Sequence, residues 1–289
     1  MDQKIIDLYD TFTHGGMDRR QFLDRLGELA GSTAAAVALL PLLQNDYARA
    51  AIVPPDDARL AIDKITYNSN GTAINGYLAR PKEKGKRPAV VVIHENRGRN
   101  PHIEDVARRL ALEGFLVLSP DLLSVAGGTP PDDDQARDLH AKTDKAAMLN
   151  AALAAIPFMK NHAESTGKVG AVGFCYGGGV VNSMAVASAD LGAGVAYYGA
   201  QPPAEQVASI KAPLLLQYGG LDQRINAGIP AYEAALKAAG KRYTIHIYDN
   251  VNHAFNNDTG DRFDKPAADL AWSRTIAFFK ENLGAPGKA

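Results

Sequence analysis

The sequence has a single cysteine, Cys175, among its 289 residues, so no internal disulfide can form. It also lacks the paired cysteines of thiolate-rich zinc sites, and its seven histidines never occur in the H-E-x-x-H pattern of zinc hydrolases. The adjacent residues His94 and Glu95 therefore do not form a metal motif. From these absences we expect no bound metal and no cofactor.

Other absences exclude whole classes of function. A net charge of −1 and a pI of about 6.7 indicate no basic surface for nucleic acid. No apolar run reaches the ~18 residues that a membrane-spanning helix needs. Neither a G-x-G-x-x-G dinucleotide fingerprint nor a G-x-x-x-x-G-K-[ST] phosphate loop occurs. With 46% hydrophobic residues, the chain is predicted to form one large globular domain with an appendage.

The most informative stretch is an apolar run that ends in glycines, K-V-G-A-V-G-F-C-Y-G-G-G at residues 168–179. It predicts a buried strand that turns directly into a helix at Cys175. Gly173 and Gly177 flank the cysteine in the pattern G-x-C-x-G, a nucleophile elbow with sulfur in place of oxygen. A thiol at a helix N-terminus is predisposed to ionise, which favours a nucleophile over the alternative of a small buried hydrophobic residue.

The first 57 residues allow two interpretations. Asp18-Arg19-Arg20-Gln21-Phe22-Leu23 resembles a twin-arginine export signature, and the apolar stretch 32–43 and an A-x-A pattern before Ala51 follow it. This layout predicts periplasmic export with cleavage. The alternative is a folded helical hairpin, residues 4–13 and 19–30, packed on a cytoplasmic enzyme by its apolar stripes. Residues 54–57 then form a linker to a catalytic domain, residues 58–289.

From Ala58 onward the pattern predicts an α/β fold with a mostly parallel, doubly wound sheet. Residues 60–67 and 73–78 alternate in hydrophobicity around Asn68-Ser69-Asn70-Gly71, as in an antiparallel hairpin. Continuous apolar strands and amphipathic helices alternate after it, which indicates parallel pairing. The expected strands span 88–94, 115–119, 169–174, 193–197, 213–218 and 243–248, and the expected helices span 103–113, 230–239 and 267–282. Ligands are then expected at the carboxyl ends of the strands.

Two further strand ends carry the partners that a thiol nucleophile needs. One predicted strand runs into Asp222, and another is followed by a loop that contains His253. The order Cys175, Asp222, His253 is that of the α/β-hydrolase triad. His253 is then the base that takes the thiol proton, and Asp222 orients its imidazole. Asp249 is a rival acid that also follows a strand.

The motifs G-F-C-Y-G-G-G, G-G-L-D, N-H-A-F and H-E-N-R-G resemble those of the dienelactone hydrolase family of α/β-hydrolases, over residues 62–283. The resemblance implies that Glu95 hydrogen-bonds the resting thiol until substrate binds; the alternative is a structural carboxylate paired with Arg97 or Arg99. It also implies an oxyanion hole made by the backbone N–H groups of Tyr176 and Asn96.

The chain departs from the family at two arginines that hold the carboxylate of dienelactone. The stretch P-D-L-L-S-V-A-G-G lacks the first, and Ala-Phe-Asn-Asn after His253 lacks the second. Other cations lie near active-site strand ends and are candidates to replace them: Arg97, Arg99, Arg224 and Arg262. We therefore predict a cysteine-dependent hydrolase of a small ester or lactone. The alternatives are a carboxylesterase or thioesterase on the same scaffold, and a non-catalytic thiol-sensing or ligand-binding scaffold.

Overall fold

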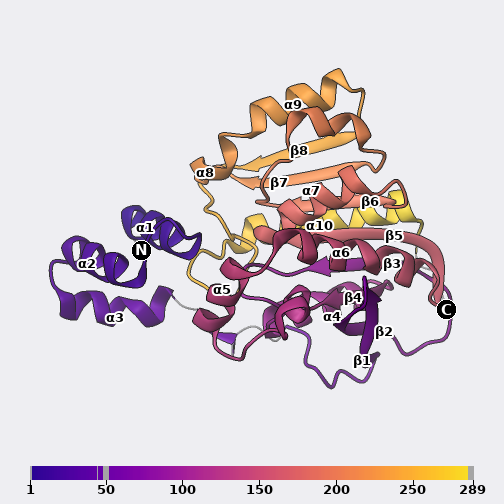
Figure 1. Ribbon diagram of the computed structural model, residues 1–289, viewed down its shortest axis with the longest axis horizontal. Helices are drawn as coiled ribbons and strands as arrows, with labels where there is room; N and C mark the ends of the chain where they lie inside the picture. Colours follow the sequence, from indigo (N-terminus) through magenta and orange to yellow (C-terminus); the bar gives the residue numbers. More distant parts are fainter. Residues whose placement is uncertain (1, 44, 48–51, 286–289) are drawn as a thin grey trace.

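In the computed structural model, which describes residues 2–43, 45–47 and 52–285, eight strands form a single sheet (Figure 1). Its order is β1-β2-β4-β3-β5-β6-β7-β8. The first two neighbour pairs are antiparallel and all later pairs are parallel. The strands are β1 (Leu60–Ser69), β2 (Thr72–Pro81), β3 (Arg87–Ile93), β4 (Leu116–Pro120), β5 (Ser165–Phe174), β6 (Ala193–Tyr197), β7 (Leu214–Gly219) and β8 (Tyr243–Tyr248). The predicted α/β-hydrolase fold is confirmed.

The local sequence explains both kinds of pairing. The hairpin turn between β1 and β2 places Asn70 and Gly71 at φ values of 50° and 87°, the left-handed region that asparagine and glycine tolerate best. Every residue of β3 is buried, as the continuous apolar sequence from Pro88 onward predicts for a strand covered on both faces. Parallel strands need crossover connections, and the helices supply them.

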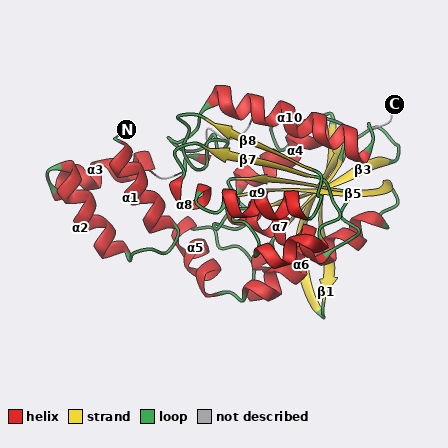
Figure 2. Ribbon diagram, turned by 90° about the horizontal axis from the view of Figure 1, so that it is seen from above, coloured by secondary structure: helices red, strands yellow, loops and turns green. Residues whose placement is uncertain are grey.

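Two layers of helices cover the sheet (Figure 2). Helices α6, α7 and α9 pack on one face around a core that contains Met148, Val181 and Leu236. Helices α4 and α10 pack on the other face around Ile103 and Phe279. The helices of this domain are α4 (Pro101–Leu112), η2 (Leu122–Ala126), α5 (Asp133–Lys142), α6 (Lys145–Lys160), α7 (Tyr176–Ala187), η3 (Ala204–Ser209), α8 (Gln223–Asn226), α9 (Ile229–Ala238) and α10 (Lys265–Leu283).

Three helices precede the sheet and form a small unit of their own: α1 (Gln3–Thr13), α2 (Arg19–Ala30) and α3 (Thr33–Leu43). Its core holds Phe12 stacked on Phe22 at a ring-centroid distance of 4.4 Å, with Leu26 fully buried beside them. Asp18 and Gln21 form a reciprocal capping box at the start of α2. The described part of the segment therefore has the helices of the hairpin interpretation, together with a third helix.

Arg19 and Arg20, the residues of the export signature, lie in the first turn of α2. The A-x-A pattern at 48–50 lies outside the described residues, so export and cleavage stay predictions. Among the described residues no single helix is long and apolar enough to cross a membrane; α2 and α3 meet that criterion only as a pair, bent by 109°.

The N-terminal unit lies against the edge of the sheet where the parallel strands end (Figure 1). Helix α1 makes most of the polar contacts to the domain. The Gln3 side chain donates a hydrogen bond to Asn252, and the Asp10 carboxylate forms ion pairs with Arg224 and Arg262. These contacts bring the loop after α1 to the place where the fold puts its functional groups.

Candidate active site

Cys175 lies at the corner between β5 and α7, where it is the N-cap residue of the helix. Its backbone has φ 54° and ψ −116°, a strained conformation for a residue with a side chain. The backbone N–H of Cys175 donates to the carbonyl of Tyr197 on β6, at 3.1 Å, which holds the corner against the sheet. This geometry is the sharp strand-to-helix turn that the glycine pattern predicted.

The flanking glycines are needed because the backbone comes very close to them. A Cβ atom at Gly173 would lie 2.1 Å from the carbonyl oxygen of Gly177. A Cβ atom at Gly177 would lie 2.4 Å from the carbonyl oxygen of Ile93 on β3. Both distances are far below van der Waals contact, and the atoms in the way are backbone. The prediction that these two positions pass close to neighbouring backbone is therefore confirmed.

The structure brings His253 and Asp222 to the same corner. His253 Nδ1 lies 2.5 Å from Asp222 Oδ2, and both residues are buried. The imidazole of His253 packs between the rings of Tyr198 and His14, at centroid distances of 4.8 and 5.0 Å. Its Nε2 atom has no hydrogen-bond partner among the described residues. The histidine is thus oriented by a carboxylate on one side and keeps its other nitrogen available toward the thiol.

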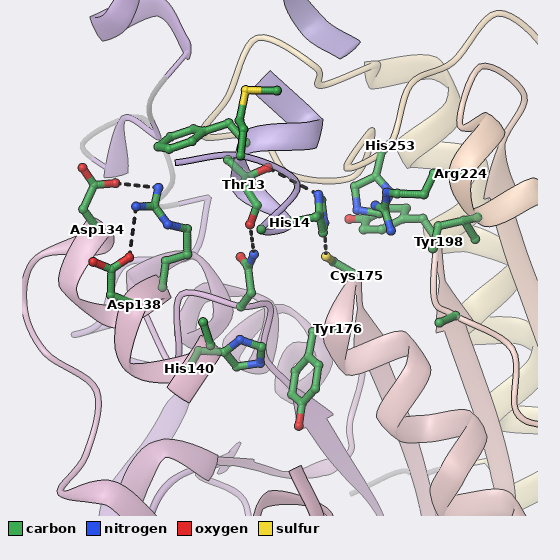
Figure 3. Close-up of a pocket in the computed structure, with 18 of the residues that line it drawn as sticks. Thr13, His14, Asp134, Asp138, His140, Cys175, Tyr176, Tyr198, Arg224 and His253 are labelled. Atoms are coloured by element: carbon green, nitrogen blue, oxygen red, sulfur yellow. Dashed lines mark hydrogen bonds and ion pairs between the residues drawn. The ribbon is translucent and has the colours of Figure 1, made fainter. Parts of the chain in front are cut away.

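His14, the C-cap residue of α1, contacts the thiol from the N-terminal unit (Figure 3). Its Nε2 atom lies 3.2 Å from Cys175 Sγ. Its Nδ1 atom lies 2.7 Å from the Asp10 carbonyl oxygen and 3.3 Å from the Asp10 carboxylate. Sequence reasoning missed this residue, since a single histidine at a helix end carries no local motif and lies 161 positions from the cysteine.

The two histidines set the ionisation of the thiol. Burial by itself raises the pKa of Cys175, but the positive charges of His14 and His253 outweigh it and lower the pKa to about 6. Burial likewise disfavours the charged form of His253, but the thiolate and Asp222 together raise the pKa of that imidazole. The site therefore favours a thiolate–imidazolium pair at neutral pH.

Glu95 makes a different hydrogen bond from the one that the family resemblance implies. It follows the end of β3 and is buried, but its Oε2 atom accepts a hydrogen bond from Asn257 at 2.9 Å. Its Oε1 atom is buried without a partner among the described residues, so the carboxylate is not hydrogen-bonded to the thiol. The imidazole of His14 contacts the sulfur instead. The alternative ion pairs do not form either, because Arg97 pairs with Asp133 and Arg99 with Glu104.

The residues expected at the oxyanion hole line the same cavity as the thiol. Tyr176 is the first residue of α7, and Asn96 lies in the loop that follows Glu95. The Asn96 side chain donates to the carbonyl of Thr13 at 2.7 Å, so the N-terminal unit anchors this loop as well. Buried His94 fixes the same loop from behind: its two ring nitrogens contact the Glu95 carbonyl at 2.6 Å and the Leu122 N–H at 3.1 Å.

Each arginine considered as a substrate clamp is engaged by acidic or phenolic groups. Arg97 is buried, donates to Tyr9 at 2.7 Å and pairs with Asp133. Arg224 and Arg262 share the carboxylate of Asp10, which they and the two active-site histidines keep ionised: its pKa lies below the usual value although burial raises it. Arg99 pairs with Glu104. Of the four, only Arg224 lines the cavity above the thiol.

That cavity has a volume of about 650 Å³, enough for a small organic substrate. The N-terminal unit forms one wall and the catalytic domain the others. The residues that line it include Phe12, Thr13, His14, Met17, Asn96, Arg137, His140, Lys145, Cys175, Tyr176, Tyr198, Ile225 and His253. A substrate held there would therefore touch both units.

Comparison with known families finds two matches. The dienelactone hydrolase family matches residues 74–283, and a family described as YqhI-like matches residues 1–31. A relative from Saccharolobus solfataricus, assigned as a carboxymethylenebutenolidase, is 30% identical over 255 residues, which are 75% of this chain and 97% of the relative. A hydrolase fragment of Escherichia coli K12, YghX, is 51% identical over 112 residues, 38% of this chain and 96% of the fragment.

Solved structures that resemble this chain include proteins assigned to the same family. A protein from Klebsiella pneumoniae assigned as a dienelactone hydrolase has a TM-score of 0.69 and 28% identity, and the match covers 77% of this chain and 99% of that one. A dienelactone hydrolase-like promiscuous phosphotriesterase from metagenomic libraries has a TM-score of 0.70 and 25% identity, with 78% and 100% covered.

The lowered pKa of Cys175 predicts how fast the thiol reacts with iodoacetamide at each pH. A group whose pKa falls from 9.0 to about 6 is protonated and slow below pH 6 and largely thiolate by pH 7. The alkylation rate should therefore rise through a midpoint near pH 6 and be almost level at pH 8. In His14→Ala the midpoint should move to higher pH, because one of the two stabilising cations is lost.

The matched control is His162→Ala, which removes a histidine from the loop before β5, at the opposite end of that strand from Cys175. It should leave the midpoint unchanged. A wild-type midpoint near 9, or equal midpoints in wild type and His14→Ala, would contradict this account of the thiol.

Proposed function

The chain belongs to the dienelactone hydrolase family of ester-hydrolysing enzymes, and from this premise we propose that Cys175 is the nucleophile that attacks a carboxylic ester or lactone. The observation that supports the proposal most strongly is the arrangement of three side chains from three strand ends. Cys175 lies on a strained corner, and His253, held by Asp222, lines the same cavity with a buried ring nitrogen that has no hydrogen-bond partner in the described part of the chain.

Each side chain has a distinct role in the proposed reaction. His253 takes the proton of the thiol and later delivers it to the leaving alcohol, while Asp222 orients the ring and stabilises its charged form. The thiolate attacks the carbonyl carbon, the alcohol leaves with the proton from His253, and an acyl-thioester remains on Cys175. Water, activated by His253, then releases the acid and restores the thiol. The N–H groups of Tyr176 and Asn96 are proposed to stabilise the oxyanion in both steps.

His14 adds a second imidazole to this arrangement. At 3.2 Å from Sγ, it stabilises the thiolate before substrate binds, the state in which the resemblance assigned a role to Glu95. The Thr13 carbonyl, one residue earlier, holds the Asn96 loop. The proposed active site therefore includes the N-terminal unit, and export with cleavage before Ala51, which stays a prediction, would remove it.

Single substitutions in the three side chains test the proposal. Cys175→Ala should abolish hydrolysis of an activated ester such as p-nitrophenyl acetate, and Cys175→Ser should leave far less activity than wild type. Asp222→Asn should lower kcat by about 10⁴-fold, since the imidazole is then held in the wrong tautomer. His253→Ala should be as damaging, because members of a triad act as a unit.

Asp249→Asn is the matched control for the acid. Asp249 also follows a strand but is exposed, and it should be replaceable with little change in kcat. Normal turnover in Cys175→Ala, or equal losses in the two aspartate variants, would be incompatible with the proposed triad.

The ion pairs of Arg97, Arg99, Arg224 and Arg262 affect which substrate charge the site can accept. A carboxylate placed in a closed pocket without a charge-assisted partner loses several kcal/mol of solvation. The four arginines considered as clamps already pair with Asp10, Asp133 and Glu104. We propose that the enzyme prefers neutral esters or lactones over anionic ones.

This preference predicts a comparison between matched substrates. The kcat/KM for a neutral lactone or short acyl ester should equal or exceed that for the corresponding carboxylate-bearing dienelactone, and the ratio should change little with salt. An advantage of tenfold or more for the anionic substrate, abolished by Arg224→Ala but not by Arg99→Ala, would show that Arg224 leaves Asp10 to bind the substrate.

A further inference from the structure

Three groups that bind soft metal ions meet at the base of the cavity. One ring nitrogen of His14, one of His253 and the Sγ atom of Cys175 all lie within 4.8 Å of one another. Two of them, His14 Nε2 and Sγ, are 3.2 Å apart, and His253 Nε2 is buried without a hydrogen-bond partner among the described residues. We propose that Cys175, His14 and His253 form a Zn²⁺ site, and that bound zinc holds the enzyme in an inactive state.

The spacing of the three atoms suits a tetrahedral ion. With Zn–S near 2.3 Å and Zn–N near 2.0–2.1 Å, the ligand atoms of such a site lie roughly 3.3–3.6 Å apart. The observed group needs only small side-chain movements to reach this spacing. Thiolate and imidazole together favour zinc over Mg²⁺ and Ca²⁺, which prefer oxygen.

A carboxylate lies near the Nδ1 atom of each histidine, the ring nitrogen that would not bind the metal. His253 Nδ1 lies 2.5 Å from Asp222, and His14 Nδ1 lies 3.3 Å from the Asp10 carboxylate and 2.7 Å from its carbonyl oxygen. A carboxylate or carbonyl on the far nitrogen fixes the ring of a zinc-bound histidine and strengthens it as a ligand. The two rings have this support independently, one from the catalytic domain and one from α1.

The cavity gives the ion a route from solvent and leaves room for a fourth ligand. All three residues line the same 650 Å³ cavity. On binding, the proton held between Cys175 and His253, and any proton on His14 Nε2, passes to solvent, and sulfur–zinc and nitrogen–zinc bonds form with no change of oxidation state. The electron pair that would attack the ester and the nitrogen that would take the proton are then both engaged. Hydrolysis stops until the metal is removed.

The sequence predicted no metal because the three ligands form no local motif. His14 lies in a different unit of the chain from Cys175 and His253, and no two of the three ligands show the short spacing of a zinc motif. Only the docking of α1 on the sheet edge brings the third ligand to the other two. A catalytic domain without this unit would offer two ligands, too few for a closed or stable zinc site.

The test uses the full-length protein, stripped of metal with a chelator. Titration with Zn²⁺ should show one ion per chain, and turnover of p-nitrophenyl acetate should fall in proportion to the bound metal and return with EDTA. Co²⁺ in place of zinc should produce a thiolate-to-metal charge-transfer band. Loss of a group that only supports a ligand typically costs about 10–100-fold in metal affinity. His14→Ala removes a ligand and should therefore weaken zinc binding by about 100-fold or more. His162→Ala should leave the zinc affinity unchanged.

Two variants protect the test against a misfolded His14→Ala protein. Asp10→Asn keeps all three ligands and the backbone carbonyl at His14 Nδ1, and should weaken zinc binding by about 10-fold, because only the carboxylate support is lost. Cys175→Ser keeps the shape of the site and should lose the charge-transfer band.

Equal zinc affinity in wild type and His14→Ala, the absence of the charge-transfer band, or a gain of turnover on adding zinc would overturn the proposal. Its inhibitory part depends on the proposed nucleophile, but the binding part does not. A metal-free enzyme that hydrolyses esters normally and binds no zinc refutes only this inference. A protein that binds one zinc ion but never hydrolyses esters refutes the proposed reaction and leaves the site in place.

Discussion

The strained backbone at Cys175 is the constraint on which the rest of the site depends. A residue with a side chain at φ 54° persists only where its surroundings fix it, and here they include the Tyr197 carbonyl and the glycine contacts to β3 and α7. The buried parallel strands provide that rigidity. The strain lifts the thiol out of the sheet at the start of a helix, where a negative charge is favoured. The turn thus fixes the position of the thiol, and the charges of His14 and His253 then lower its pKa.

Docking of the N-terminal unit is the second condition. Its ion pair from Asp10 to Arg224 is weak by itself, since the Arg224 side chain is 42% exposed and surface pairs contribute ~0–1 kcal/mol. The hydrogen bond from Arg97 to Tyr9 contributes more to docking, because Arg97 is buried and its guanidinium would lose a partner if α1 dissociated from the domain. The same docking delivers His14 to the thiol and the Thr13 carbonyl to Asn96. The unit therefore forms part of the cavity wall and contacts the thiol, in addition to packing on the domain.

The sequence predicted what depends on local pattern. Strand periodicity, the glycine frame of the elbow and the chain order of Cys175, Asp222 and His253 each report on nearby backbone, and the fold placed all three side chains together. The sequence could not predict the position of His14, because its contact with the thiol depends on the packing of two units and no local pattern reports on that packing. The hydrogen bond of Glu95 to Asn257 and the ion pairs of Arg224 and Arg262 to Asp10 also join distant segments. For these residues the sequence indicated which side chains lie near the site, but it could not indicate which partners they bind.

The central claim, that the sulfur of Cys175 carries the acyl group, is tested most directly by trapping the intermediate. The full-length enzyme is mixed rapidly with an activated acetate ester, quenched in acid and analysed by intact mass and peptide mapping. The account predicts one acetyl group per chain, on the peptide that contains Cys175, formed in a burst before steady-state turnover and released by hydroxylamine as a thioester should be. An acetyl group on another residue, or full turnover with no acylated enzyme in a Cys175→Ala protein, would contradict it.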